Sequence, residues 1–210
     1  TGPLELLSTS GDVTISGNPR SVSANSTSGD VEIAGSIPGR VQAKSTSGDV
    51  HVGGAVREGI AAEVVSGDIE ITANSSEIVA NAVSGSILLS GAANRISTAT
   101  VSGDTEIRTN RINYGAFESV SGDIRFEAAL EPGAALTLTT HSGEVEAVFP
   151  SDVSADFRAT TFSGRIQNEF GGEARRTSRY APGSELRFST GNDGVVVLKS
   201  FSGAIRIRKQ

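Results

Sequence analysis

The acidic residues that follow repeated Ser-Gly pairs are the first candidates for chemistry in this sequence. They form a column directly after the glycine, which reads Asp12, Asp30, Asp49, Asp68, Asp104, Asp123 and Glu144. If the repeats stack as parallel strands, neighbouring carboxylates lie about 5 Å apart and repel by roughly 1 kcal/mol in water. Because that repulsion needs an offset, we expect each carboxylate to accept backbone N–H groups within its own Ser-Gly-Asp turn.

Two functional interpretations of this acidic column stay open. Divalent cations could bind between neighbouring carboxylates, with Asp30, Asp49 and Asp68 as the candidate ligands. Paired carboxylates could also cleave a polysaccharide, which requires a separation of about 5 Å or about 6.5–9.5 Å. The column is interrupted at Ser86, Arg165 and Ala204, which excludes an unbroken ion track. A repeat-wide aspartate is typical of a structural role, so we predict no metal, no cofactor and no enzymatic activity.

A second column, of hydroxyl side chains, stands three residues before the glycine. Its members are Ser8, Ser26, Ser45, Thr100, Ser119, Thr140, Thr161 and Ser200. A serine nucleophile needs a nearby base, but His51 and His141 are several repeats apart, which separates them by well over about 10 Å. This excludes a triad built on both histidines, and two lone histidines make no metal site. We expect a ladder of hydroxyl groups bonded to neighbouring backbone.

An insertion that breaks the repeat carries the residues most suited to binding. Within about 169–194, which we expect to form an insertion and an extra hairpin near the C-terminal cap, the candidate ligand-binding residues are Arg175, Arg176, Arg179 and Tyr180. Guanidinium groups and a tyrosine at this spacing could bind an anionic glycan, a phosphate polymer or an acidic protein segment. Because the repeat does not require the insertion, its residues are free to make specific contacts.

The elements that must position these columns follow from the spacing of the Ser-Gly pairs. Ten Ser-Gly pairs recur at nearly fixed spacing, with the glycines Gly11, Gly29, Gly48, Gly67, Gly85, Gly103, Gly122, Gly143, Gly164 and Gly203. Successive glycines of this series are separated by 18, 19, 19, 18, 18, 19, 21, 21 and 39 residues. Aliphatic residues recur seven and five positions before each glycine, and two and four positions after it, so period-two strands flank a tight turn. This coherence predicts an all-β, single-domain β-solenoid (a parallel β-helix) of about ten coils with 18–21-residue repeats. Charges at Arg206, Arg208 and Lys209 would then protect an open final strand from aggregation.

Composition narrows the function classes. Of the 210 residues, which we assign to one domain spanning 1–210, none is cysteine, so thiol chemistry and disulfides are excluded. The net charge of −6 argues against nucleic-acid binding, which needs a basic face. No apolar run approaches the length of a transmembrane span, and any targeting segment would lie outside this chain.

The repeated Thr-Ser-Gly-Asp-Val-x-Ile core resembles a known family. Segments 26–33 and 119–126 are similar to bacterial β-strand repeats that carry an adhesin label and have no established function. The resemblance implies a β-solenoid domain on the bacterial cell envelope or outside the cell, and it supplies no catalytic residues. We therefore predict a non-enzymatic scaffold or binding module that presents a repetitive β-surface to cell-wall glycan or to another envelope protein. A polysaccharide-active β-helix enzyme and a self-assembling structural solenoid are the alternatives.

Overall fold

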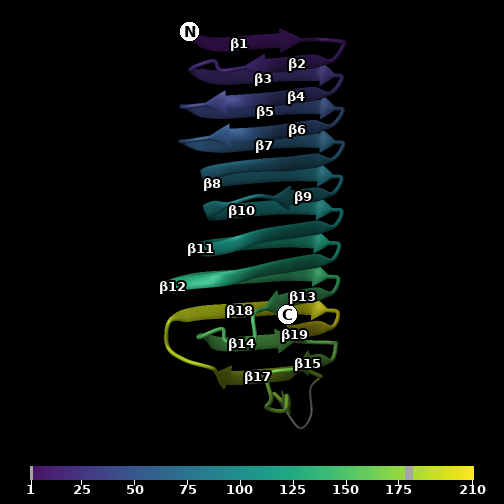
Figure 1. Ribbon diagram of the computed structural model, residues 1–210. Coiled ribbons are helices and arrows are strands. Elements are labelled where there is room, and N and C mark those ends of the chain that lie inside the picture. The colour runs from purple at the N-terminus through teal and green to yellow at the C-terminus, as the bar shows by residue number, and fades with distance from the viewer. Residues whose placement is uncertain (1, 178–181) are drawn as a thin grey trace.

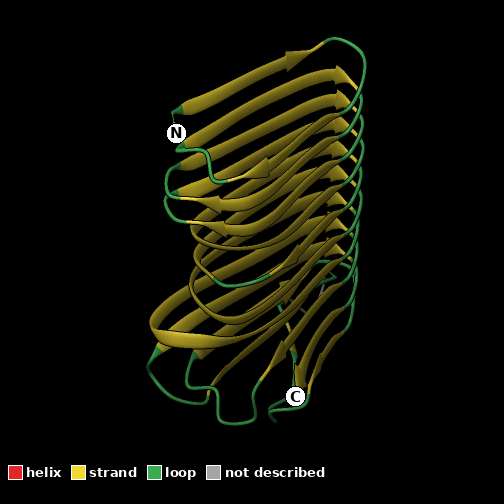
Figure 2. Ribbon diagram, turned by 45° about the horizontal axis from the view of Figure 1, so that its top comes forward, coloured by secondary structure: helices red, strands yellow, loops and turns green. Residues whose placement is uncertain are grey.

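Two layers of stacked strands, joined at the Ser-Gly turns, make up the fold (Figures 1 and 2). The structure is a computed structural model and describes residues 2–177 and 182–210. Each coil runs along one layer, bends at a Ser-Gly pair and returns along the other layer. Strands that precede the Ser-Gly turns form the first layer, and strands that follow them form the second. No described residue is helical.

The strands fall into three groups by layer. The first layer contains β1 (Pro3–Ser8), β3 (Ser21–Ser28), β5 (Arg40–Ser47), β7 (Gly59–Ser66), β10 (Ala93–Ser102), β14 (Asp156–Thr161), β17 (Ser184–Ser189) and β18 (Gly194–Ser202), with the two-residue β16 (Arg175–Arg176) at its end. The second layer contains β2 (Val13–Gly17), β4 (Val31–Ile37), β6 (Val50–Val56), β9 (Ile87–Ser90), β13 (Val145–Phe149), β15 (Ile166–Asn168) and β19 (Ile205–Lys209). Three long strands bend from the second layer into the first: β8 (Ile69–Ser84), β11 (Thr105–Ser121) and β12 (Ile124–Ser142).

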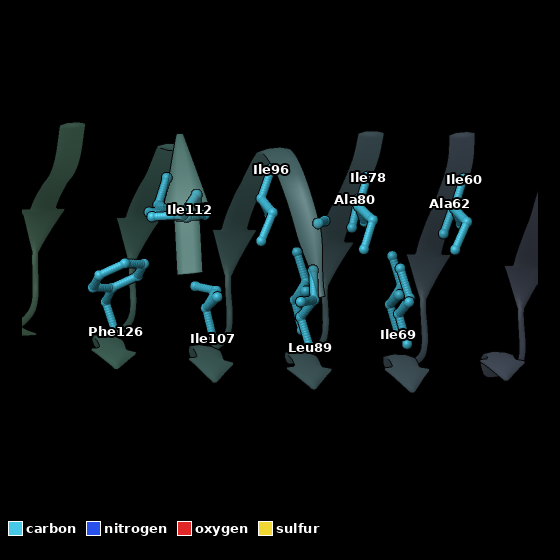
Figure 3. Close-up of a cluster of buried hydrophobic side chains, with 14 of the residues drawn as sticks. Ile60, Ala62, Ile69, Ile78, Ala80, Leu89, Ile96, Ile107, Ile112 and Phe126 are labelled. Carbon is cyan, nitrogen blue, oxygen red and sulfur yellow. The ribbon is translucent and has the colours of Figure 1, made fainter. Parts of the chain in front are cut away.

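The core is a narrow strip of aliphatic side chains between the two layers (Figure 3). Ile60 and Ile78 point inward from the first layer, and Ile69 and Leu89 point inward from the second. Their columns are the ones that the alternation predicts, because successive residues of a strand face opposite sides. Where the first layer has Gly115 in an aliphatic column, the Leu136 side chain and the Phe117 ring occupy the space that a side chain there would need.

Parallel pairing in constant register makes the chain a β-solenoid, as the sequence predicts. Val22 pairs with Val41 in the first layer and Val31 with Val50 in the second, so like columns lie over one another. The coils follow the order of the chain for about eight turns, whose glycines are Gly11, Gly29, Gly48, Gly67, Gly85, Gly103, Gly122 and Gly143.

The last two Ser-Gly turns are stacked in reversed order. Strand β18 pairs with β12 on one side and with β14 on the other, and β19 lies between β13 and β15 (Figure 1). The final coil of the sequence is therefore inserted between the turns at Gly143 and Gly164. The expectation that Arg206, Arg208 and Lys209 protect an open final strand is wrong, because β19 pairs with β13 along its whole length and with β15 over residues 205–207.

The C-terminal end of the solenoid is closed by aromatic residues. Strand β17 runs antiparallel to β14 and places Phe188 on Phe157, with ring centroids 4.5 Å apart. Phe170, from the start of the insertion, packs 6.0 Å from Phe157, and the Lys209 ammonium lies 5.0 Å from its ring. The insertion thus covers the core at this end of the stack.

Candidate functional site

The acidic column has a structural role, with a different partner from the one expected. The Asp30 carboxylate accepts the N–H of Asp49 at 2.8 Å, and the Asp49 carboxylate accepts the N–H of Asp68 at 2.8 Å. The same bond joins Asp68 to Ser86 and Asp123 to Glu144. Each aspartate of the column therefore bonds the equivalent residue of the next coil, and the expectation of a bond within its own turn is wrong. These bonds offset the repulsion between stacked carboxylates.

The hydroxyl column forms the predicted ladder in part. Ser45, Thr140 and Ser200 each donate to a glycine carbonyl of the neighbouring coil, at 3.0, 3.2 and 3.1 Å. Ser26 and Ser119 are buried, and their hydroxyl groups have no hydrogen-bond partner among the described residues. The column thus fastens successive turns to one another at the edge of the solenoid.

The histidines and carboxylates do not assemble into a metal-binding cluster in the described part of the chain. Within that part, no three of these side chains lie close enough together to hold an ion. His51 instead lies 3.3 Å from the Glu70 carboxylate on the second layer. His141 stacks on Phe201, with parallel rings 4.8 Å apart.

The arginine-bearing insertion lies at the C-terminal end of the stack. Arg175 and Arg176 are exposed and form the two-residue β16, opposite Glu185 and Ser184 of β17. Arg179 and Tyr180 lie outside the described residues. Arg176 and Arg165 line one hollow of about 520 Å³, together with Glu173. A ligand-binding role for the arginines and Tyr180 stays a prediction.

A line of exposed side chains, apolar except for one histidine, runs along the outer face of the first layer. It stands two residues before the glycine in seven successive coils, and we call it the apolar stripe: Val65, Val83, Val101, Val120, His141, Phe201 and Phe162, in spatial order. The valines are 48–50% exposed, and the two phenylalanines 45% and 47%. Large contiguous apolar surfaces of this kind mark interaction sites, whereas scattered apolar residues do not.

Three stacked rings form the C-terminal part of the apolar stripe. Phe201 lies between His141 and Phe162, at 4.8 Å from each, and the ring planes differ by only 2° and 6°. Because the rings cover one another's faces, they present mainly their edges to solvent. Edges of stacked rings can bury apolar area, but they offer little free ring face for stacking against a sugar.

A long groove follows the apolar stripe. It has a volume of about 1430 Å³, with the hydroxyl column along its floor and the apolar stripe along one side. Its other side includes Asn81, Ala99 and Thr139, which lie four residues before the glycine. Thr177, Pro182 and Gly183 of the insertion stand at one end of it. The groove thus extends along nearly the whole first layer.

The outer face of the second layer has the opposite character. Glu146 lies 2.9 Å from Arg125 and 2.8 Å from Arg208, so one carboxylate joins two neighbouring coils. The hydrogen bond and charge of Glu146 raise the pKa of Arg125 above its ordinary value. Arg206 is paired with Glu144 in the same region. Charges in this C-terminal part of the face are therefore paired within the chain.

The apolar stripe could have been recognised from the sequence. Its column begins with Thr9, Thr27 and Thr46, then changes to valine and finally to aromatic residues. The alternation places this column outside the core, where a change from threonine to valine gains nothing for packing. The acidic and hydroxyl columns alone suggested chemistry, so this change was not recognised as a binding signal.

Comparison with known families places the chain in one of them. The fold and its paired layers define a β-solenoid repeat protein. The sequence matches the Toastrack DUF4097 family over residues 1–99 and again over residues 90–208, and the chain belongs to this family. Comparison with curated proteins and with solved structures returns no match. Within residues 2–177 and 182–210 there is no helix with the length and apolar character needed to cross a membrane.

Proposed function

We propose that this chain is a non-enzymatic, adhesin-like binding module of the cell envelope, which engages a partner protein through the apolar stripe. A repeat solenoid in a family of unknown function fits a scaffold or binding role. The observation that carries the proposal is the exposed row from Val65 to Phe162 on one face, opposite a face whose charges are paired internally in its C-terminal part.

The chemistry of the apolar stripe favours a protein partner with an apolar surface over a glycan. Sugars are recognised by free aromatic faces and by directed polar groups. Here the faces of Phe201 are covered by His141 and Phe162, and the hydroxyl groups of Ser45 and Thr140 are bonded to backbone. Valine side chains and ring edges instead gain energy by losing contact with water.

The absence of catalysis is part of the proposal. Most carboxylates of the acidic column accept a backbone amide of the next coil, which is a structural use of the groups that a glycosidase would need free. Incubation with acidic and with neutral polysaccharides, scored for new reducing ends or unsaturated products, should give no turnover. Turnover above a heat-inactivated control would overturn this part and favour the polysaccharide-active alternative.

Binding to envelope material tests the choice of surface. Envelope fractions from the source cells are compared before and after protease treatment, together with purified cell-wall glycan. The double variant Val83→Asp/Val101→Asp should lose binding to the intact fraction, because two charges would be buried against an apolar partner. Leu88→Asp is the matched control, since Leu88 is the exposed apolar residue on the second layer, at 37% exposure. Protease treatment should also abolish binding.

The arginines of the insertion are the alternative binding site, and a variant without them tests that alternative. The triple variant Arg175→Ala/Arg176→Ala/Arg179→Ala should bind the intact fraction like the original chain. If this variant loses binding to purified glycan while the Val83→Asp/Val101→Asp variant keeps it, the insertion is the binding site and the proposal is wrong.

The envelope setting is the third part of the proposal. It is supported by the resemblance to adhesin-labelled repeats, and display outside the cytoplasm would expose the apolar stripe to partners on other cells or in the wall. Cell fractionation, with the chain followed by antibody, should find it in the envelope or the medium. A pool confined to the cytosol would contradict this part.

A further inference from the structure

We propose that the partner on the apolar stripe is a second copy of this chain, packed side by side and antiparallel. This inference rests on the proposed function, because it names the occupant of the same surface.

The repeat distance of the apolar stripe selects its occupant. Successive coils are separated by the parallel-strand spacing of about 4.8 Å, which is also the distance between the stacked rings of Phe162 and Phe201. An extended polypeptide lying along the stripe would turn a side chain toward it every 6.4–6.8 Å or so, and would lose register within a few rows. A second solenoid of the same chain has the same spacing, so every one of its rows can stay in register.

The residues beside the apolar stripe allow two flat faces to approach. In the four middle coils, seven of the eight outward positions six and four residues before the glycine hold small or uncharged residues. These are Val79, Asn81, Ser97, Ala99, Ala116, Thr137 and Thr139. Glu118 is the one acidic residue among these positions in the same coils. Sheets with side chains of this size pack face to face at about 10 Å, with rows interdigitated.

The area of this face is close to what a stable dimer uses. The apolar stripe covers seven coils, and a face of that height and of one strand's length has an area of roughly 700 Å². Specific interfaces bury about 800 Å² on each partner. Pairing through this face alone therefore comes near the usual size.

Charge favours the antiparallel arrangement. Residues 1–105 contain 5 basic and 11 acidic side chains, which gives −6, whereas residues 106–210 contain 13 of each, which gives 0. Parallel packing would set one acidic half against the other. Antiparallel packing sets each acidic half against a neutral one, which lowers the repulsion.

The charges on the face also select the position of the two-fold axis. An axis through the coil of Val120 would bring Glu118 opposite its own copy. An axis between the coils of Val101 and Val120 places Glu118 opposite Ala99 instead. It also sets Glu63, which is paired with Lys44 of its own chain, opposite Lys199 twice. With this axis, Val65 of one copy lies opposite Phe201 of the other.

Sedimentation velocity over a wide range of protein concentration tests whether the pair exists. The chain should shift from monomer to dimer, and Val83→Asp/Val101→Asp should weaken this self-association by about a hundredfold or more. Leu88→Asp should associate like the original chain. Circular dichroism of all three confirms that the exposed substitutions leave the fold intact.

Cross-linking tests the arrangement, because the chain contains no cysteine and single cysteines can be placed freely. With a short bifunctional maleimide, a mixture of Val65→Cys and Phe201→Cys chains should give cross-linked dimers, and Val65→Cys alone should give few. Cross-linking of Val65→Cys with itself would overturn the antiparallel arrangement.

The results separate this inference from the proposed function. A chain that stays monomeric at all concentrations, yet loses envelope binding in Val83→Asp/Val101→Asp, refutes the second copy and keeps the protein partner. Self-association that both aspartate variants leave unchanged refutes the second copy on this face. Loss of self-association only in Val83→Asp/Val101→Asp supports the inference.

Discussion

The two outer faces of this solenoid have the same stacking of coils but carry different kinds of side chain. On the second layer, Glu146 joins Arg125 and Arg208 across neighbouring coils, so charges are arranged in pairs. On the first layer, the column that contains Val101 and Phe201 stays apolar and about half exposed. The first layer also carries an ion pair, between Lys44 and Glu63, but only its outer face has a row of exposed apolar side chains available for a partner.

This difference shows how stacking brings like side chains of an outward column close together. Because the coils lie about 4.8 Å apart, every column repeats its side chain at close range, and like charges in it repel. A charged column therefore needs alternation or a partner such as the amide that each aspartate bonds. An apolar column needs neither, and its repetition builds a continuous surface instead of isolated apolar residues.

The largest expected effect is at the Ser-Gly corner, on which both faces depend. A Cβ at Gly103, where φ is +142°, would overlap the Gly85 carbonyl oxygen of the preceding coil. Gly103→Ala should lower the free energy of unfolding by about 3 kcal/mol or more, because both the backbone strain and the close approach oppose it. Chemical denaturation measures this loss.

Gly11→Ala is the matched control for the corner. Gly11 also has a positive φ, +118°, but its Cβ would meet nothing within 4 Å. We expect a loss of about 1 kcal/mol, due to backbone strain alone. Equal losses at both positions would show that the close stacking of the corners, and with it the shared spacing of the two faces, is not a constraint.

Introducing a lysine tests the contrast between the faces directly. Glu146 is 12% exposed and lies between two arginines, so Glu146→Lys should destabilise the chain by about 2 kcal/mol through lost pairing and added repulsion. Val101→Lys, on the apolar stripe, should change the free energy of unfolding by less than about 0.5 kcal/mol. Similar losses in the two variants would erase the difference that we describe.

A smaller effect on the free energy of unfolding is expected from the acidic column, which lies at the turns between the two faces. Asp49→Ala removes the acceptor for the N–H of Asp68 and should cost about 1 kcal/mol. Asp49→Asn keeps an oxygen at that place and should cost much less. If both variants lose the same stability in thermal unfolding, then the charge rather than the amide bond matters.

The smallest effect on stability should come from extending the apolar stripe. Thr46 stands in the same column, one coil before Val65. Thr46→Val should leave the free energy of unfolding within about 0.5 kcal/mol of the original, yet strengthen self-association several-fold by adding apolar area. Weaker association of this variant in sedimentation velocity would contradict a role for the column.

Much of the fold could be predicted from the sequence, because the core columns and glycine turns recur at fixed positions. The reversed order of the last two coils could not. Strands β14 and β18 both present the same apolar columns, so either could pair with β12 in register. The antiparallel β17, which lies within the insertion, pairs with the outer side of β14 in the observed order.

The candidate site was harder to predict than the fold. The acidic column was correctly interpreted as structural, but the spacing of the repeats does not tell whether each carboxylate accepts an amide of its own turn or one of the next coil. The apolar stripe was visible in the sequence as the change from Thr46 to Val65. Its exposure depends on the bend of the strand and on the stacking, which the structure supplies.

Hydroxyl-radical footprinting of the chain at low and at high protein concentration tests the central claim most directly, since it reports the solvent access of individual side chains. We predict that Phe201 and Phe162 become several-fold less reactive as the concentration rises, while Leu88 on the second layer stays unchanged. Protection of Leu88 with unchanged reactivity of both phenylalanines would place the interaction on the wrong face and contradict the account.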